Sequence, residues 1–342
     1  MNDDFASMPE QRMPEPRAPE PQTEPAEVKI ARFAKILDAA VDKVVKGQPG
    51  VVRHILVALL VQGHVLLEGN PGTAKTLLVR TLSKLCNLEF RRIQFTPDLM
   101  PSDITGTSIF RPDTAQFEFR KGPVFTQLLL TDEINRAPAR TQAALLQAMQ
   151  ERMVSADGAD HILSEVFTVV ATQNPLENEG TYPLPEAELD RFLFKLMVDY
   201  PNEQAELEIF KQHGAPKSAD DFAALGKEAL FGATELAAMR RVVMRVDVRP
   251  DIADYTLKIV RATREHPFLR AGASTRAGVM LLRAARALAC TEGRGYVIPD
   301  DVRELVPAAL RHRLYRTAAA ELEGTTTDTI LEDIVNRIPP PR

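Results

Sequence analysis

A loop of small residues between a strand pattern and a helical pattern constrains this chain more than any other feature. Residues 64–68 read HVLLE, residues 69–76 read GNPGTAKT, and apolar residues at helical spacing follow. The loop nearly matches G-x-x-x-x-G-K-[ST], in which backbone N–H groups and a helix start converge on phosphate oxygens. Lys75 would neutralise the β- and γ-phosphates, and the Thr76 hydroxyl would hold Mg2+. The predicted nucleotide-binding residues of this loop are Gly69, Asn70, Pro71, Gly72, Thr73, Ala74, Lys75, Thr76 and Leu77.

Ala74 departs from the usual pattern, which has its second glycine at this position. Phosphate loops need close backbone approach and uncommon dihedral angles, which glycine adopts most easily. We expect Ala74 to be tolerated with a negative φ, as suits a residue where a helix begins. The alternative is a chance loop between strand and helix, which Lys75 and Thr76, in phase after a strand, disfavour.

Composition indicates an ordinary soluble protein with an unusual first segment. Of 342 residues, 44% are hydrophobic and 26% are charged, and the net charge of -5 gives no reason to expect nucleic acid. The two cysteines have no metal-ligand spacing, and no signal segment or membrane-spanning apolar stretch is evident, so we expect a cytoplasmic protein. Residues 1–26 are rich in Pro and Glu and predict a disordered tail, with a docking arm for a partner as the alternative.

Strand and helix patterns alternate from residue 27 to residue 204. Helical spacing is found in residues 28–45, 76–87 and 141–152, and short apolar strands in residues 63–69, 89–96, 167–175 and the end of 123–134. Strands separated by helices predict an α/β fold with a mainly parallel sheet covered on both faces. From residue 205 to residue 342 almost every periodic segment is helical, which predicts a second, helical domain.

Two polar clusters follow strands of this predicted sheet. In LLLTDEIN, Asp132 would lie beside Mg2+, and Glu133 would polarise the attacking water as general base. Asn174 ends another strand, where its amide could hydrogen-bond the γ-phosphate and that water. The alternatives are a helix N-terminal cap for the carboxylates and a simple turn for Asn174, which precedes Pro175.

Several blocks of this sequence together closely resemble the MoxR family of AAA+ ATPases. They are GNPGTAKT, LLLTDEINRAPARTQAALLQAMQER, ATQNP and LPEAELDRFLFK, with RIQFTPDLMPSDITG and GASTRAG also typical of that family. The resemblance extends from about residue 30 to residue 320. It implies an AAA+ nucleotide-binding core over residues 27–204, a parallel sheet flanked by helices, followed by a small all-helical lid domain over residues 205–342. Members often have alanine at the position of Ala74, which favours nucleotide binding.

The resemblance also implies a role for each catalytic residue. Lys75 and Thr76 are the Walker A residues, Asp132 and Glu133 the Walker B pair, and Asn174 is sensor 1.

Two arginines acquire roles from the same resemblance. Arg191 is the arginine finger that reaches the ATP of a neighbouring subunit, and Arg276 is sensor 2, at the start of a helix that Ser274 or Thr275 would cap. The alternative for either arginine is a surface ion pair. Gly47 marks the place where the chain passes the adenine, with Val44 and Val45 packed on the base, and a plain helix C-terminal glycine is compatible with that role.

Two predicted hairpins correspond to family insertions. SDITGTSIFRPDTAQFEFRKGPVF resembles the helix-2 insert, and RMVSADGADHILS, with a turn at Asp157-Gly158, resembles the hairpin before sensor 1. Such loops usually face the ring pore or a client protein. Ordinary hairpin decoration is the alternative.

The resemblance implies Mg2+-dependent ATP hydrolysis in a homo-oligomeric ring, expected to be a hexamer. The implied role is chaperone-like remodelling or maturation of protein complexes, including metal-cofactor insertion, often with a von Willebrand factor A domain partner, without nucleic acid or membrane insertion. One alternative is a nucleic-acid motor or metal-chelatase subunit, but the second hairpin is acidic rather than basic. Another is a non-catalytic ATP-binding scaffold, which would have no need for Glu133, Asn174 and Arg191.

Overall fold

The computed structural model describes residues 24–175, 181–214, 222, 225 and 229–341. Residues 1–23 of the predicted disordered tail lie outside this described part of the chain. The central element is a five-stranded parallel sheet in the order β2-β5-β8-β1-β9, which confirms the predicted α/β fold. Its strands are β1 (Val65–Glu68), β2 (Phe90–Gln94), β5 (Leu128–Asp132), β8 (Thr168–Gln173) and β9 (Phe194–Met197).

The sheet separates two hydrophobic clusters because successive strand residues point to opposite faces. Leu67 and Leu130 pack in the cluster that contains α1 (Ala26–Asp42), α2 (Pro49–Leu60) and α3 (Lys75–Leu85). Leu66 and Leu129 pack in the other cluster, against α5 (Ala139–Glu151). Both faces are therefore covered, as a parallel sheet requires. Short helices α4 (Pro101–Thr105), η1 (Ile134–Arg136) and α6 (Glu186–Leu189) complete this part.

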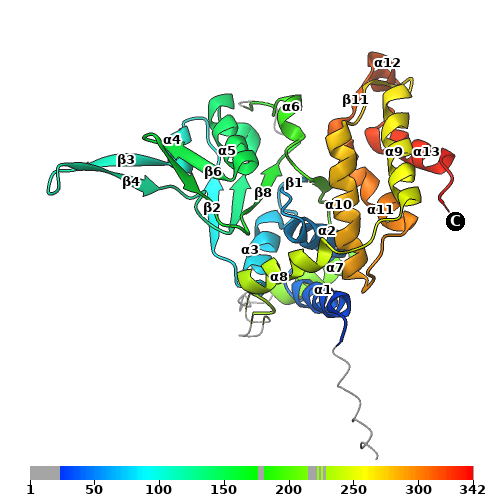
Figure 1. Cartoon of the computed structure of the whole chain (residues 1–342), viewed down its shortest axis with the longest axis horizontal. Helices are drawn as coiled ribbons and strands as arrows, with labels where there is room; N and C mark the ends of the chain where they lie inside the picture. Colours follow the sequence, from blue (N-terminus) through cyan, green and yellow to red (C-terminus); the bar gives the residue numbers. More distant parts are fainter. Residues whose placement is uncertain (1–23, 176–180, 215–221, 223–224, 226–228, 342) are drawn as a thin grey trace, which may run out of the picture.

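Both predicted hairpins are present. β3 (Gly106–Arg111) pairs with β4 (Gln116–Lys121), and this hairpin projects from the sheet at the left of Figure 1. β6 (Met153–Ala156) pairs with β7 (Ala159–Ile162), and Asp157 and Gly158 both have positive φ in the turn between them. That conformation matches the Asp-Gly turn predicted from the sequence.

Helices dominate the chain after residue 203. They are α7 (Glu203–His213), α8 (Ala233–Val243), α9 (Pro250–Glu265), α10 (Thr275–Thr291), α11 (Pro299–Leu310), η2 (Arg311–Arg313), α12 (Ala318–Leu322) and α13 (Thr327–Arg337). The sequence did not predict a two-stranded antiparallel ladder that joins β10 (Leu269–Ala271) to β11 (Tyr315–Arg316) among them. α8 packs against α1 and α2, whereas α9 to α13 gather at the right of Figure 1. The domain boundary near residue 205 stays a prediction.

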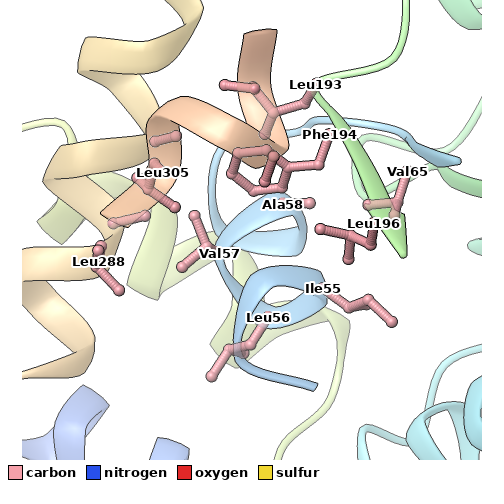
Figure 2. Close-up of a cluster of buried hydrophobic side chains, with 14 of the residues drawn as sticks. Ile55, Leu56, Val57, Ala58, Val65, Leu193, Phe194, Leu196, Leu288 and Leu305 are labelled. Atoms are coloured by element: carbon pink, nitrogen blue, oxygen red, sulfur yellow. The ribbon is translucent and has the colours of Figure 1, made fainter. Parts of the chain in front are cut away.

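Helix α2 connects the sheet to the lid helices. Ile55, Leu56, Val57 and Ala58 on α2 are all buried. Figure 2 shows α2 between β9 and the lid residues Leu288 and Leu305, in α10 and α11, and all of these side chains belong to one buried cluster. Sheet and lid thus share one continuous core. Among the described residues, no helix combines the length and apolar character that a bilayer crossing needs.

Candidate active site

The phosphate loop runs from the end of β1 to the first turn of α3. A side chain at Gly69 would place its Cβ 2.2 Å from the carbonyl oxygen of Val198, so only glycine fits there. Gly72 has a φ of +82°, which also favours glycine. The Lys75 ammonium donates to the carbonyl oxygens of Gly69 at 2.7 Å and Asn70 at 2.8 Å. Burial lowers the pKa of Lys75, and the nearby carboxylates Asp132 and Glu133 oppose that shift.

The predicted conformation of Ala74 is wrong. Its φ is +58° with ψ at 21°, in the left-handed region, although α3 begins at Lys75 as expected. The helix-start argument fails because Ala74 is the residue before the first helical one, where the loop still turns. In this conformation the Ala74 carbonyl accepts from the Leu78 N–H at 2.9 Å and so joins the helix. Alanine pays about 1–2 kcal/mol for such a conformation relative to its right-handed one.

Asp132 lies at the carboxyl end of β5, beside the loop. The Thr76 hydroxyl is 3.3 Å from each of its carboxylate oxygens. Thr172 of β8 donates to Oδ1 at 3.1 Å, and Arg92 of β2 donates to Oδ2 at 2.6 Å. Three side chains therefore contact the Asp132 carboxylate, and only 7% of the Asp132 side chain is exposed, so its orientation is fixed. A hydroxyl and a carboxylate this close form the oxygen pair that Mg2+ prefers.

Glu133 follows with a strained backbone, at a φ of +56°. Its N–H donates to the Thr172 hydroxyl at 3.0 Å, which stabilises the turn. Gln94 donates to its carboxylate at 2.7 Å, and Arg136 lies 3.1 Å from the same oxygen. Residues of β2 and η1 thus hold the Glu133 carboxylate, and Glu133 lines the same pocket as the phosphate loop.

These residues enclose one pocket of about 410 Å³. Its lining includes Lys75, Thr76, Asp132, Glu133 and Asn174. Asn174 is 7% exposed, just beyond the end of β8. The structure therefore brings together the predicted loop, metal, base and sensor 1 side chains. An ammonium, a hydroxyl and two carboxylates beside a helix N-terminus fit a nucleoside triphosphate with Mg2+. We call this the phosphate pocket.

The two predicted arginines line a second pocket of about 300 Å³. Arg152 and Arg283 line it too, and its described lining contains no acidic residue. We call it the arginine pocket. It shares no lining residue with the phosphate pocket, as the two sets of described residues show.

Each of these arginines also has a local partner. Arg191 donates to the Gln150 side chain at 3.0 Å and lies 3.7 Å from Glu188. Arg276 is the second residue of α10 and lies 4.0 Å from Asp190. Ser274 caps that helix by accepting from the Ala277 N–H at 3.1 Å.

Gly47 lies in the turn between α1 and α2, with a φ of +76°. A Cβ there would be 3.4 Å from the side chains of Pro201 and Ala205, next to the start of α7. Val44 and Val45 are buried in the core. The adenine-binding role of these residues stays a prediction.

Arg92, Gln94 and Thr172 are functional candidates that the sequence analysis missed. Arg92 and Gln94 are two residues apart on β2, and the sheet register pairs Gln94 with Asp132. For Arg92 and Gln94, the only hint in the sequence was the predicted strand RRIQF, which has a polar residue near its carboxyl end. Which strand lies beside β5 depends on sheet order, which residue spacing does not determine.

Comparisons with known proteins agree with this architecture. Residues 64–194 match the family described as "ATPase family associated with various cellular activities (AAA)", and residues 261–334 match an AAA lid domain. The uncharacterized Bacillus subtilis protein YeaC is 42% identical over 88% of this chain and 92% of its own length. The Mycobacterium tuberculosis chaperone MoxR1 is 42% identical, over 88% of this chain and 81% of its own. A crystal structure from Cytophaga hutchinsonii, of a protein assigned as an ATPase, is 38% identical with a TM-score of 0.84, and covers 93% of this chain and 97% of that one.

Proposed function

This chain belongs to the MoxR family of AAA+ ATPases, and we propose that it hydrolyses ATP at sites shared between the subunits of a ring. The observation that carries the proposal is the division of the predicted catalytic residues between two pockets. The phosphate pocket holds Lys75, Asp132 and Glu133, whereas the arginine pocket holds Arg191 and Arg276. A chain of this kind has a complete set of groups only where two copies meet.

Each group of the phosphate pocket has a defined task. Lys75 and the N–H groups at the start of α3 bind the phosphates, and Thr76 and Asp132 hold Mg2+. Bound Mg2+ neutralises developing charge on the phosphate oxygens. Glu133 accepts a proton from the attacking water, in a position that Gln94 and Arg136 maintain. Asn174 orients that water and the γ-phosphate.

The arginine pocket would complete the site of a neighbouring subunit. Arg152, Arg191, Arg276 and Arg283 line it, whereas Glu188 and Asp190, the acidic neighbours of two of them, do not. The described lining therefore carries an excess of positive charge, which attracts a polyanion. Arg191 and Arg276 would stabilise the charge on the transferred phosphoryl group. Because Arg276 lies in the first turn of α10, its contact with a neighbour's nucleotide would couple ATP turnover to the position of the lid.

Turnover in a ring would serve the remodelling or maturation of client protein complexes in the cytoplasm. MoxR1, a relative that covers most of this chain, is a chaperone by name. The projecting β3–β4 hairpin carries Phe110 and Phe117, which are 49% and 73% exposed and suit contact with an apolar client segment. A hexamer, insertion of a metal cofactor into clients and a von Willebrand factor A domain partner are further parts of the proposal, and these rest on family resemblance.

Light scattering with and without Mg-ATP, combined with phosphate release from the same samples, tests the proposal. We expect a nucleotide-dependent ring that hydrolyses ATP, and an Arg191→Ala variant that assembles but does not hydrolyse. Turnover by a monomer that Arg191→Ala leaves unchanged would contradict shared sites. A persistent ring without turnover would identify a scaffold instead.

A further inference from the structure

The lid contacts the short segment that carries Arg191 through two side chains of η2. Residues 190–193 lie between α6 and β9, and the side chains of His312 and Arg313 in η2 contact three of their four residues. We infer that Arg313 is a positioning residue for Arg191, so that the lid sets the geometry of the arginine that acts on a neighbouring subunit. This inference rests on the proposed function.

Arg313 makes an unusually complete set of hydrogen bonds. Its Nε donates to the Asp190 carboxylate at 2.6 Å. One terminal nitrogen, Nη2, donates to the carbonyl oxygens of Asp190 at 3.1 Å and Phe192 at 2.7 Å, and the other, Nη1, donates to those of Leu193, at 3.2 Å, and Ala309. The planar guanidinium can bond in several directions at once, whereas the ammonium of a lysine is a single point charge. The backbone on both sides of Arg191 is thereby fixed to one side chain.

His312 adds a second support from the same turn. Its Nε2 lies 3.0 Å from the Phe192 carbonyl oxygen, which can only accept, so Nε2 carries the proton. Burial holds the pKa of His312 well below its usual value, and the ring is therefore neutral. The Phe192 carbonyl thus accepts from both His312 and Arg313.

The same cluster reaches the second arginine of the pocket. Arg276 lies 4.0 Å from the other oxygen of the Asp190 carboxylate, and Nη2 of Arg313 contacts the sulfur of Met280 on α10 at 3.4 Å. Asp190 therefore lies between Arg313 and Arg276. We call Asp190, His312 and Arg313 the Asp190 cluster. Because it contacts both the Arg191 segment and α10, a movement of the lid would move Arg191 and Arg276 together.

The Arg313 side chain is 2% exposed, so it cannot itself reach a nucleotide on another subunit. Arg191 has 24% of its side chain exposed and lines the arginine pocket. The exposed Arg191 can therefore contact a neighbouring subunit, whereas the buried Arg313 fixes the backbone that carries Arg191. Removing Arg313 should therefore reproduce the defect of removing Arg191, on the neighbouring subunit's site.

Mixed rings separate this role from a general structural one. A subunit with Arg313→Lys keeps an intact phosphate pocket but presents Arg191 poorly, whereas a subunit with Glu133→Gln presents Arg191 well but has no base. Alone, Arg313→Lys should lose at least about tenfold in phosphate release, as expected for lost bonds to a charged donor, with nucleotide affinity unchanged. Mixed in equal amounts with Glu133→Gln, it should recover roughly a quarter of the wild-type rate, because one in four interfaces then pairs a working site with a working arginine.

Three further samples make the result interpretable. Arg191→Ala mixed with Glu133→Gln reports whether sites are shared at all. Arg311→Lys is the matched control: Arg311 contacts Asp328 and the Lys195 carbonyl but not residues 190–193, so its rate should stay near wild type. Asp190→Asn, which removes the ion pair and keeps the carbonyl contacts, should show a smaller loss and the same recovery, and it serves if Arg313→Lys does not fold.

The outcomes separate the two claims. If the Arg191→Ala mixture recovers activity and neither the Arg313→Lys nor the Asp190→Asn mixture does, Arg313 supports only its own subunit and the inference is overturned. Wild-type rates in both variants alone would also overturn it. If the Arg191→Ala mixture fails to recover, the shared-site proposal itself is wrong.

Discussion

The phosphate pocket and the arginine pocket differ in how the chain builds them. The phosphate pocket takes Lys75, Thr76, Asp132, Glu133 and Asn174 from short motifs at the ends of parallel strands, and β2 adds Arg92 and Gln94 beside them. The arginine pocket takes Arg152 from the end of α5, Arg191 from the segment before β9 and Arg276 from the lid. Its geometry depends on the docking of the lid through the Asp190 cluster. The main groups of the phosphate pocket therefore come from local motifs, whereas the arginine pocket forms only through tertiary contacts.

This difference suggests where each pocket is vulnerable. Changes in the phosphate pocket should affect a subunit's own site. Changes in the arginine pocket or its support should affect a neighbour's site and leave nucleotide binding intact.

Arg191→Ala should reduce phosphate release by about 10³- to 10⁵-fold, the range found for arginines that stabilise phosphoryl-transfer charge. Nucleotide affinity, measured by fluorescence titration, should not change, because Arg191 does not line the phosphate pocket. Arg261→Ala is a suitable control, since Arg261 is an exposed lid residue that pairs only loosely, at 3.9 Å, with Glu265. Loss of nucleotide binding in Arg191→Ala would break the division between the pockets.

Glu133→Gln should reduce phosphate release by about 10²- to 10⁴-fold, as expected for loss of a general base. The amide keeps the shape and can still bond to Gln94, so nucleotide should stay bound and its dissociation should slow. Single-turnover measurements distinguish chemistry from product release. Glu118→Gln on the projecting hairpin is the matched control, and an equal loss there would contradict the assignment of the base.

Acid should destabilise the folded chain through His64, which lines the arginine pocket. Burial lowers the pKa of His64 to about 3, whereas the unfolded chain has the ordinary value of 6.5. Between these values the unfolded state binds the extra proton, so stability falls as pH falls below 6.5, by up to about 1.4 kcal/mol per pH unit. The neutral ring accepts from the Val169 N–H at 2.9 Å.

Urea unfolding of wild type and His64→Asn at pH 7, 6 and 5 measures this effect. The variant should be less stable at pH 7 but should lose less on acidification, because it lacks the group. His54, whose pKa burial lowers to about 4, contributes equally to both proteins. If the free energy of unfolding fell equally with pH in the two proteins, His64 would not be the cause of the acid effect.

Ala74→Gly should stabilise the folded chain by about 0.5–1 kcal/mol. Glycine relieves the left-handed conformation at a φ of +58°, and this gain exceeds the added entropy of the unfolded chain. Ala143→Gly inside α5 should instead destabilise by about 0.5–1 kcal/mol, since that residue is helical. Chemical denaturation of both variants provides the comparison. A loss of stability in Ala74→Gly would show that the loop does not hold this conformation.

The sequence predicted the local pocket far better than the tertiary one. The side chains of one pocket include Lys75, Thr76, Asp132, Glu133 and Asn174, as their motifs indicated, because the neighbouring parallel strands β1, β8 and β5 end at one edge of the sheet. The φ of Ala74 was missed, since residue type alone does not show that the loop turns through its last residue.

Elements without an amphipathic pattern were also missed. Helix α2 is apolar on nearly all sides because it lies between the sheet and the lid, so periodicity did not identify it as a helix (Figure 2). Arg313 gave no sequence signal either, since only the folded lid brings residue 313 to residues 190–193.

The dependence of ATPase rate on protein concentration shows whether one subunit alone can hydrolyse ATP. If catalysis needs the phosphate pocket of one subunit and the arginine pocket of the next, phosphate release per wild-type subunit should rise steeply with concentration and follow the assembled fraction. A rate per subunit that stays constant down to concentrations where the protein is a monomer would contradict the account.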